Sequence, residues 1–474
     1  MFKKVSPQVN FAGEEEAVLQ FWQDNDVFEK SLEQRRGNDE YVFYDGPPFA
    51  TGLPHYGHLL AGTIKDAIPR YQTMRGKYVE RVFGWDCHGL PVENEMEKEL
   101  EISSKHEIEA YGIDKFNESC RKIVLRYTGE WENVVHRMGR WVDFDKGYRT
   151  MDMTYMESIW WVFKSLWDKD LVYEGQKILP YCPRCATPLS NFEATGEGVH
   201  QTVSDPAVTV RFKMVDAADT WMLAWTTTPW TLPANLGLIV GPDIEYVTIV
   251  DDGARFILAA DRVVEYYKDD VPEIVERCQG RDLVGRRYEP LLPYFSELAD
   301  EGAFVVVDDP FVTTDSGTGI VHSAPGFGED DARVAKDHGI PADVCPVDAE
   351  CCYTEEVSDW VGRFVKDCDR DIIARLKADE NLVHRNSYSH AYPHCWRCDS
   401  PLIYRAISTW FIRIDRIKDA MLRANSQIRW LPDHIKDGRF GKWLENARDW
   451  AVSRNRYWGC PLPIWRNEET GEAI

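Results

Sequence analysis

The chain has 474 residues, 44% of them hydrophobic and 28% charged, enough to bury a large core in two or more domains. Its net charge of −24 repels a phosphate backbone at long range, so we expect no DNA partner, while a local basic patch can still hold RNA. No apolar run is long enough to span a bilayer, and Met1-Phe-Lys-Lys4 does not start a signal peptide. These features predict a soluble, cytoplasmic protein without a membrane partner.

The first part of the chain reads as helix, strand, loop and helix. A helical extension is expected over residues 1–40, with an amphipathic pattern over 11–32. Residues 41–44 form a short apolar run typical of a buried strand, and Asp45-Gly-Pro-Pro48 ends it. After a Gly/Pro loop, His55-Tyr-Gly-His58 opens a segment with helical spacing.

The two histidines of this segment are three residues apart, so they lie on one face of the first helical turn. A helix N-terminus has unpaired N–H groups and a partial positive charge, which suit an anion such as a triphosphate. His55 and His58 would add donors, and Gly57 has no side chain to keep a planar ring off the backbone. An ordinary pair of surface histidines gives the same short pattern, so the pattern alone leaves both interpretations open.

A second strand is expected over residues 78–83, before the loop Gly84-Trp-Asp-Cys-His-Gly-Leu-Pro91. Two strand–helix units in succession predict an α/β fold with a doubly wound parallel sheet, whose ligands sit at the carboxyl ends of the strands. That rule places Gly46, Pro47, Asp86 and the histidines around one crevice. Asp86 can hold an ammonium group there, or it can simply cap a turn.

Two Cys-x-x-Cys pairs lie far apart in the chain, and each is followed by Pro-Leu at the same offset. In a chain without a signal peptide, the twelve cysteines are expected to be thiols and metal ligands rather than disulfides. Each pair can supply two thiolates to a tetrahedral Zn²⁺, and neither has a thioredoxin-like context. We predict one zinc ion in a zinc ribbon, held by Cys182, Cys185, Cys395 and Cys398.

The long segment between these pairs has short β-branched runs punctuated by Gly and Pro, which favours an antiparallel, barrel-like domain. The runs are residues 207–212, 236–240, 246–250, 256–260 and 304–307. Two stretches stand out: Thr226, Thr227 and Thr228 are adjacent, and His322 precedes an acidic cluster that includes Asp331. By composition alone these are strand residues and a helix start.

The string GPPFATGLPHYGH resembles the first signature of the class I aminoacyl-tRNA synthetases, where this loop and helix bind ATP. The stretch GWDCHGLPVE resembles the isoleucyl enzymes, whose aspartate binds the amino group of the amino acid. The resemblance implies a doubly wound catalytic domain and the partners tRNA(Ile), isoleucine and ATP, the last bound as Mg-ATP. It implies ATP binding by His55, Gly57 and His58, and amino-acid binding by Gly46, Pro47 and Asp86.

The threonine stretch and residues 317–331 resemble, as a pair, the editing domain of the isoleucyl, valyl and leucyl enzymes, which hydrolyses wrongly charged tRNA. The resemblance implies that Asp331 anchors the amino group of the substrate and that His322 helps to exclude the correct amino acid. The threonines would orient ester and water. The implied editing residues are Thr226, Thr227, Thr228, His322 and Asp331.

These motifs set expected domain boundaries and a predicted function. We expect a helical extension at residues 1–40 and the first half of a catalytic domain at 41–180. A zinc ribbon is expected at 181–194 with 387–404, an editing domain at 195–386 and a return to the catalytic domain at 405–474. The resemblance stops before a Lys-Met-Ser-Lys-Ser loop and an anticodon-binding domain, so we expect a fragment or a split or truncated product. Ligation of isoleucine to tRNA is the predicted function. The alternatives are a hydrolase of mischarged tRNA only, a valyl-type synthetase, and a non-catalytic zinc-ribbon module that binds nucleic acid.

Overall fold

The computed structural model describes residues 8–102, 104–196, 198–268 and 270–474, so residues 1–7 of the expected extension lie outside it. The chain divides into two compact units, Met1–Asp170 with Arg456–Ile474, and Leu171–Asn455. Within the described ranges, no helix is long and apolar enough to cross a membrane. The expected functional boundaries stay a prediction, since compactness groups residues by contact and not by role.

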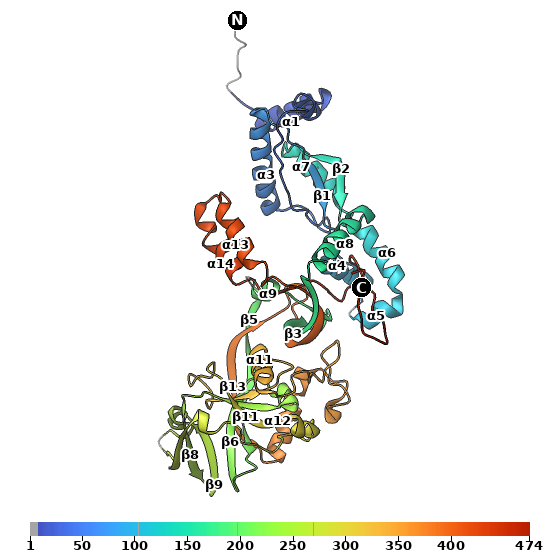
Figure 1. The fold of residues 1–474 in the computed structure, drawn as a ribbon. Helices are drawn as coiled ribbons and strands as arrows, with labels where there is room; N and C mark the ends of the chain where they lie inside the picture. The colour runs from blue at the N-terminus through green and yellow to red at the C-terminus, as the bar shows by residue number, and fades with distance from the viewer. Residues whose placement is uncertain (1–7, 103, 197, 269) are drawn as a thin grey trace. The chain divides into compact units, whose positions relative to one another are not determined.

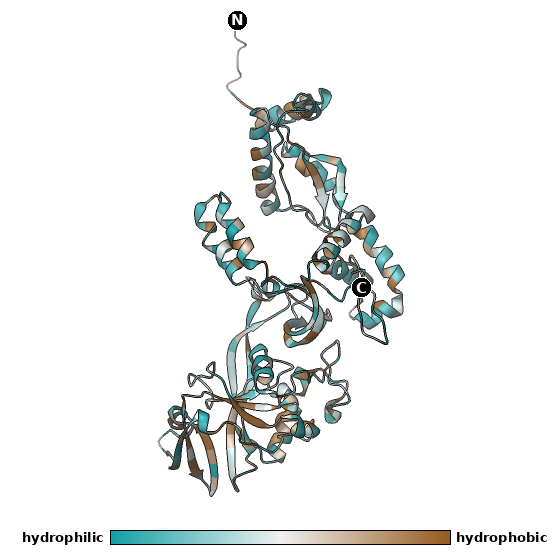
Figure 2. Cartoon of the chain, in the orientation of Figure 1, coloured by the Kyte–Doolittle hydropathy of each residue, from teal (hydrophilic) through white to brown (hydrophobic). Residues whose placement is uncertain are grey.

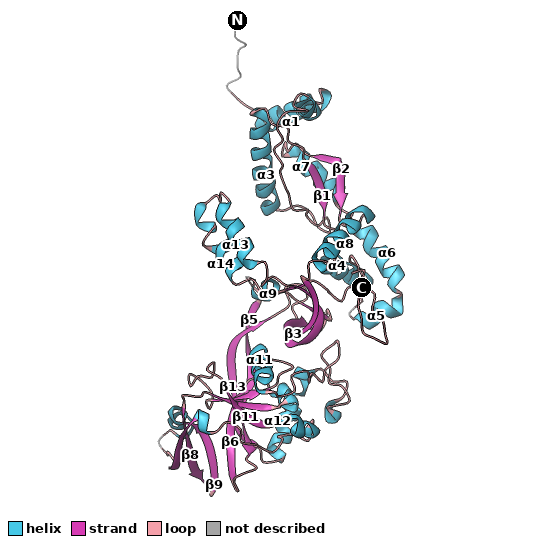
Figure 3. Cartoon of the chain, in the orientation of Figure 1, coloured by secondary structure: helices cyan, strands magenta, loops and turns pink. Residues whose placement is uncertain are grey.

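The first unit is mainly helical, with one small sheet (Figures 1 and 3). Its elements are α1 (Phe11–Asp24), α2 (Val27–Glu33), α3 (Tyr56–Met74), β1 (Val82–Trp85), α4 (Leu90–Leu100), α5 (Lys105–Tyr111), α6 (Ile113–Ile123), α7 (Thr128–Arg137), β2 (Asp143–Arg149) and α8 (Met153–Trp167). The helix expected over residues 11–32 is two helices, because the backbone of Asp26 is left-handed at φ 48° and interrupts the helical hydrogen bonds.

The strand predicted over residues 41–44 is not formed. Val42 is 65% exposed and Tyr44 92% exposed, so this apolar run is not buried either. Pro47 and Pro48 follow it, and neither has the N–H group that a continuous strand ladder needs. The segment remains extended without a regular partner.

Two isolated parallel bridges join this segment to the next, from Glu40 to Tyr78 and from Phe49 to Asp86. From the first bridge to the second, the chain advances nine residues in one segment, from Glu40 to Phe49, and eight in the other, from Tyr78 to Asp86. Because these numbers differ, a regular ladder cannot connect the two bridges. The second predicted strand also differs, since β1 starts at Val82 and not at residue 78. It pairs in parallel with β2, and the described residues of this unit form a two-stranded parallel sheet rather than a doubly wound one.

The second unit contains a four-stranded antiparallel sheet in the order β15-β14-β3-β4 and a larger nine-stranded sheet. Its strands are β3 (Val172–Cys182), β4 (Thr187–Pro188), β5 (His200–Lys213), β6 (Thr220–Thr226), β7 (Gly237–Val240), β8 (Glu245–Asp251), β9 (Ala254–Ala259), β10 (Glu273–Gln279), β11 (Val305–Asp308), β12 (Ile320–Ser323), β13 (Leu382–Pro393), β14 (Ile403–Ile412) and β15 (Trp450–Ala451). Its α-helices are α9 (Asn191–Thr195), α10 (Val263–Tyr267), α11 (Glu329–His338), α12 (Asp369–Ala378), α13 (Lys418–Gln427) and α14 (Arg439–Glu445). Its short 3₁₀ helices include η1 (Pro229–Ala234).

The nine-stranded sheet is mixed, with the order β10-β8-β9-β6-β12-β7-β11; β5 also pairs with β6, and β13 pairs with β5. Each of the five β-branched runs coincides with a strand, as predicted, although residues 236, 260 and 304 at the ends of three runs lie outside it. The expectation of an antiparallel domain is wrong, because β6 pairs in parallel with β9 and with β12, and β7 pairs in parallel with β11. Parallel neighbours need crossover connections, and local composition does not reveal which strands those connections bring together.

β5 and β13 form a long antiparallel ribbon, from the pair of Leu382 with Val210 to the pair of Pro393 with His200. The chain between them therefore leaves and returns through one two-stranded stem (Figure 1). Figure 2 shows apolar residues concentrated along the strands of the larger sheet. The main core of this unit includes the fully buried Tyr246, Tyr288 and Tyr353.

Candidate functional site

α3 begins with a reciprocal hydrogen-bonded cap made by two histidines. His55 Nδ1 accepts the Gly57 N–H at 3.1 Å, and His58 Nδ1 accepts the His55 N–H at 3.1 Å. Because both Nδ1 atoms accept backbone hydrogen bonds, each neutral ring carries its proton on Nε2 and can donate it to a ligand. Burial, His55 and Lys65 lower the pKa of His58, which favours the neutral ring.

Gly57 is required by this cap. A Cβ atom at position 57 would lie 2.9 Å from His55 Cε1 and 3.1 Å from His55 Nδ1. Carbon atoms do not approach one another that closely without a bond, so any larger residue would displace the His55 ring. The helix cap by itself therefore explains why position 57 is a glycine, in addition to any ligand that stacks on its backbone.

A cleft of about 240 Å³ opens beside the cap, and the predicted residues Gly46 and His58 both line it. Two cations, Lys65 and Arg140, line it as well. Asp45 forms ion pairs with both, and the pair with Arg140 measures 2.7 Å. The cleft wall thus combines one histidine donor, His58, with two cations whose charge is offset by Asp45 and Asp66 in the same lining. A polyanion in the cleft can replace Asp45 as the partner of these cations.

Sequence reasoning missed these two cations. Lys65 follows His58 by seven residues, which is two helical turns, so helical spacing could have placed it on the same face. Arg140 lies beyond the end of α7, and no local pattern links it to α3. Only the fold brings it to the cleft.

Asp86 lies beside the same loop but is not among the described residues that line the cleft. Its N–H donates to Pro48 O at 2.9 Å, and the Thr150 hydroxyl lies 3.5 Å from its Oδ1. Burial raises the pKa of Asp86, because a half-buried carboxylate loses hydration. Gly46 and Pro47 line a neighbouring cleft of about 280 Å³. The predicted residues therefore gather around one loop and two adjoining clefts, with His55 forming the cap.

A second candidate site is a pocket of about 200 Å³ in the other unit. Four of the five predicted editing residues line it, namely Thr226, Thr228, His322 and Asp331. Thr227 is not part of the described lining, because side chains of successive residues on an extended backbone point to opposite sides. Tyr392 from β13 also lines the pocket and was not predicted.

A buried hydrogen-bond network fixes the imidazole of His322. The Tyr288 hydroxyl donates to Asn235 Oδ1 at 2.7 Å, so the Asn235 amide directs its N–H groups elsewhere. One of them donates to His322 Nδ1 at 2.8 Å. His322 Nε2 therefore carries the proton. Burial lowers the pKa of His322 to about 3, so the ring is neutral.

The network continues to the threonines. His322 Nε2–H donates to Thr231 Oγ1 at 3.0 Å, and the Thr231 hydroxyl donates to Thr228 O at 2.8 Å. Thr228 Oγ1 lies 3.0 Å from Thr226 Oγ1 and 3.1 Å from Thr231 Oγ1. The histidine thus orients a row of hydroxyls that reaches the pocket. Thr231 and Asn235 belong to the same sequence stretch as the predicted threonines, but their roles depend on His322, 87 residues beyond Asn235.

Asp331 lies in the first turn of α11, and its Oδ2 accepts the Ala324 N–H at 3.0 Å. Burial raises the pKa of Asp331 to about 6. A Cβ atom at Gly328 would lie 2.7 Å from Asp331 Cγ, so the glycine before the helix leaves room for the carboxyl group. The carboxylate is charged at neutral pH and can pair with an ammonium group.

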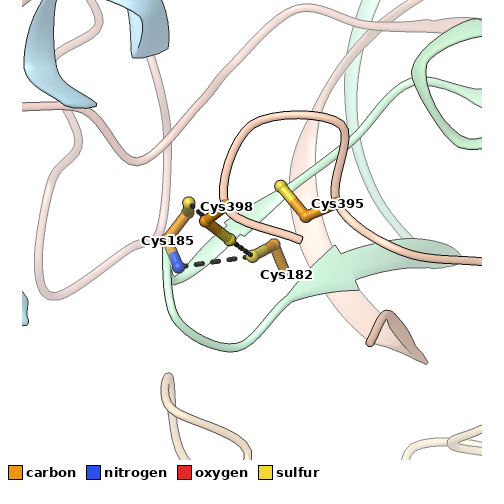
Figure 4. A group of neighbouring side chains, drawn as sticks. All are labelled: Cys182, Cys185, Cys395 and Cys398. Atoms are coloured by element: carbon orange, nitrogen blue, oxygen red, sulfur yellow. Dashed lines mark hydrogen bonds between the residues drawn. The ribbon is translucent and has the colours of Figure 1, made fainter. Parts of the chain in front are cut away.

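The four predicted cysteines converge, although up to 216 residues separate them (Figure 4). Their sulfur atoms all lie within 4.8 Å of one another, and Cys398 Sγ lies 3.4 Å from Cys182 Sγ and 3.7 Å from Cys185 Sγ. A tetrahedral zinc site with Zn–S bonds of about 2.3 Å has sulfur–sulfur edges of about 3.8 Å. The cluster therefore fits a single metal ion.

Each cysteine pair sits in a tight turn at the end of a strand. Cys182 ends β3, and the Cys185 N–H points to its sulfur at 3.4 Å. Cys395 follows β13, and its N–H donates to Ser400 O at 2.8 Å. The two turns face each other and offer four thiols to one point.

The sequence matches the family described as tRNA synthetases class I (I, L, M and V) over residues 17–474. The chain belongs to this family. It is 57% identical to an isoleucine–tRNA ligase of Treponema denticola over 100% of the chain and 46% of that protein. It is 53% identical to those of Treponema pallidum and Protochlamydia amoebophila, over 98% and 99% of the chain.

This synthetase chain spans about half the length of the curated relatives it matches, 46% in the case of the Treponema denticola protein. Among solved structures, an Agrobacterium radiobacter LeuRS in a ternary complex matches at 17% identity and a TM-score of 0.39, over 98% of this chain and 52% of that chain. A TM-score this low adds nothing to the assignment, so the family membership comes from the sequence matches.

Proposed function

We propose that this chain carries the ATP, amino-acid and editing sites of an isoleucine–tRNA ligase, which joins isoleucine to tRNA(Ile) through isoleucyl-adenylate. The observation that carries the proposal is the 57% identity to a ligase of that name along 100% of the chain. Ligation is favoured over a hydrolase alone because the capped α3, whose His58 lines a cleft, has no use in ester hydrolysis.

In the first step, a carboxylate oxygen of isoleucine attacks the α-phosphorus of ATP, and pyrophosphate leaves with the electrons of the broken P–O bond. His55 and His58 donate Nε2–H bonds to phosphate oxygens while charge shifts onto the leaving group. Lys65 and Arg140, which pair with Asp45 in this structure, supply cations to the polyphosphate. A ribose hydroxyl of the terminal adenosine of tRNA(Ile) then takes the acyl group.

Asp86 and the Gly46-Pro47 loop position the amino acid. The carboxylate of Asp86 is half-buried, so an ammonium group beside it restores the stabilisation that burial removed. The backbone of Gly46 and Pro47 lines the adjoining cleft, where the absence of a large side chain leaves room for the amino acid.

The threonine–histidine pocket hydrolyses valyl-tRNA. Valine is smaller than isoleucine by one methylene group, so a hydrophobic pocket that binds isoleucine also binds valine. One methylene changes the binding free energy by only about 1–3 kcal/mol, and this pair of amino acids is the standard example of that value. A second pocket of about 200 Å³ that accepts only the smaller product removes the error. Asp331 binds the ammonium group, Thr226 and Thr228 orient ester and water, and neutral His322 holds the hydroxyl row.

Cys182, Cys185, Cys395 and Cys398 hold Zn²⁺ in this proposal. The ion supplies a fixed tetrahedral junction between two chain segments and takes no part in either reaction. Its contribution is to the stability of the stem from which the editing pocket is built.

Isoleucine-dependent ATP–pyrophosphate exchange and valyl-tRNA(Ile) deacylation by the whole chain test the proposal. His58→Ala should slow exchange by about 10²–10³-fold and leave deacylation unchanged. Asp331→Ala should do the reverse and bring deacylation to background. His106→Ala, an exposed histidine on α5, is the matched control and should change neither.

The pattern of losses decides between the candidates. If the chain deacylates valyl-tRNA(Ile) but catalyses no ATP–pyrophosphate exchange, the proposed ligase is wrong and the chain is a hydrolase of mischarged tRNA. Equal loss of both activities in His58→Ala would indicate misfolding and contradict a phosphate role. Exchange driven by valine rather than isoleucine would indicate a valyl-type enzyme.

A further inference from the structure

The helical hairpin of α13 and α14 differs in charge from the rest of this acidic chain. Residues 416–448 contain eight Lys and Arg but only four Asp and Glu, whereas the whole chain has a net charge of −24. The cations are Arg416, Lys418, Arg423, Arg429, Lys436, Arg439, Lys442 and Arg448. Such a concentration of positive charge is the local basic patch that the overall charge does not exclude.

Six of these eight cations have no anionic partner among the residues that the structure describes. Arg448 pairs with Glu329 at 2.7 Å. Within the described ranges, no ion pair joins an acidic side chain to Lys418, Arg423, Arg429, Lys436, Arg439 or Lys442. Unpaired cations grouped on one short hairpin repel one another, so they favour a polyanion that can bind them together.

The hairpin is held by internal contacts and does not need a ligand to form. Asn425 on α13 is only 5% exposed, and its Nδ2 donates to Lys436 O at 3.0 Å across the turn. Its Oδ1 accepts the Trp430 Nε1–H at 2.8 Å. Trp430 in turn packs on Phe440 with ring centroids 4.6 Å apart. The cations are therefore displayed on a preformed scaffold.

One face of α14 combines charge with an exposed aromatic ring. Arg439, Lys442 and Trp443 occupy positions i, i+3 and i+4, so they share a face, and all three are exposed. The Trp443 side chain is 57% exposed and packs against Phe440 at a centroid distance of 5.4 Å. Cations that bind phosphates beside an aromatic ring that stacks on bases are typical of RNA-binding surfaces. The hairpin exposes two other large apolar side chains, Ile428 and Leu431, but both lie in the turn. Neither helix therefore has the broad apolar face that binds a membrane surface.

We infer that the α13–α14 hairpin is a docking surface for tRNA, with Arg439 and Lys442 on backbone phosphates and Trp443 stacked on an unpaired base. The choice of tRNA among RNAs rests on the proposed function. The hairpin contributes affinity and orientation and takes no part in chemistry.

Binding of an uncharged tRNA(Ile) transcript to the whole chain, measured by fluorescence anisotropy at several salt concentrations, tests this inference. Arg439→Glu/Lys442→Glu should weaken binding at least about tenfold and reduce the dependence on salt, because two phosphate contacts are lost. Arg370→Glu/Lys377→Glu makes the same charge change on exposed positions of α12 and should leave binding within about twofold of the parent.

Trp443→Ala should weaken binding by about five- to a hundredfold without changing the salt dependence, since stacking releases no counterions. Trp443→Phe keeps a stacking ring and should recover most of the affinity. Equal thermal unfolding of all variants shows that the hairpin has not simply unfolded.

The outcomes separate this inference from the proposed function. If the parent chain binds tRNA and the hairpin variants bind it equally well, the docking surface is wrong and the tRNA partner stands. If the parent chain binds no tRNA, both fall. Binding of phosphatidylserine vesicles that is lost in the Arg439→Glu/Lys442→Glu variant, with tRNA binding unchanged, would replace RNA by a membrane surface.

Discussion

His322 shows how burial changes what a histidine can do. The ring is 7% exposed, its pKa falls to about 3, and both nitrogens are hydrogen-bonded to Asn235 and Thr231. A ring with so low a pKa accepts a proton poorly, so it is not suited to be the general base of a hydrolysis. Its value to the pocket lies in orienting the hydroxyl row and in filling space.

His322→Ala should therefore lower stability and selectivity together. The Asn235 amide and the Thr231 hydroxyl would lose a buried partner, at a cost of about 1–3 kcal/mol for each group. The space left by the ring should admit the larger amino acid, so isoleucyl-tRNA(Ile) should be cleaved as well. Urea unfolding and deacylation of both aminoacyl-tRNAs are the measurements, with His106→Ala as the control. Unchanged selectivity would contradict a role of His322 in excluding isoleucine.

The carboxyl group of Asp331 should make editing depend on pH. Its pKa is about 6, so the carboxylate that binds the ammonium group is lost as pH falls through that value. Valyl-tRNA deacylation should halve near pH 6 and drop by about tenfold for each further pH unit. Asp331→Asn keeps an oxygen for the Ala324 N–H and should give a flat profile at background rate. A wild-type profile that is flat between about pH 5 and 7 would contradict the assignment.

The same shift has a consequence for stability. Because the pKa of Asp331 is raised above the value of 3.8 in an unfolded chain, burial of this group is least unfavourable when it is protonated. The protonated carboxyl group therefore contributes to the free energy of unfolding fully below pH 3.8, and this contribution is lost as pH rises through 6. Asp331→Asn should therefore be more stable than the parent at pH 7, as measured by urea unfolding.

At the scale of elements, the start of α3 depends on one glycine. Gly57→Ala would place a Cβ 2.9 Å from the His55 ring and break the histidine cap, so stability and adenylate formation should both fall. Gly62→Ala in the same helix is the matched control for stability only, since its Cβ would meet Arg140 Nη1 at 3.9 Å but Gly62 itself lines the cleft. It should raise the free energy of unfolding by about 0.8–1.0 kcal/mol. Equal effects of the two changes would contradict the role of the cap.

We expect the two cysteine turns to bind one shared metal ion, so that loss of one cysteine removes the ion from all four. The whole chain should contain about one zinc ion, and removing it with a chelator should lower the thermal unfolding temperature. Cys398→Ser should have the same effect on zinc content and on unfolding. Cys278→Ser on β10, a half-buried cysteine outside the cluster, should leave both unchanged. Full zinc content in Cys398→Ser would show that the four residues do not share one ion.

At the scale of the whole molecule, the β5–β13 stem sets where the editing segment can be cut. A segment over residues 195–386 ends inside β13 and loses the seven register pairs from Ser387 to Pro393, together with Tyr392 of the pocket wall. A segment over residues 200–393 keeps them. The longer return strand should give the higher unfolding temperature and the faster valyl-tRNA deacylation, and equal behaviour would show that the stem contributes nothing.

The sequence alone determined the features that short-range interactions control. The start of α3 at the two histidines, the β-branched strands of the second unit and the paired cysteine turns were predicted, because local hydrogen bonds and side-chain periodicity decide them. The reciprocal hydrogen bonds by which His55 and His58 cap α3 were not predicted. The pattern of four cysteines also predicted that distant segments meet, since two half-sites of one metal have a use only together.

The tertiary structure alone decided which surfaces meet. The apolar run at residues 41–44 has the composition of a strand, yet it makes no ladder, because the prolines after it and the unequal bridge spacing prevent regular pairing. The mixed sheet, the approach of Arg140 to α3, and the link from Asn235 through His322 to the threonines depend on contacts between distant residues. Such contacts carry no local signal, because the free energy of each pairing depends on the neighbours that the whole fold supplies.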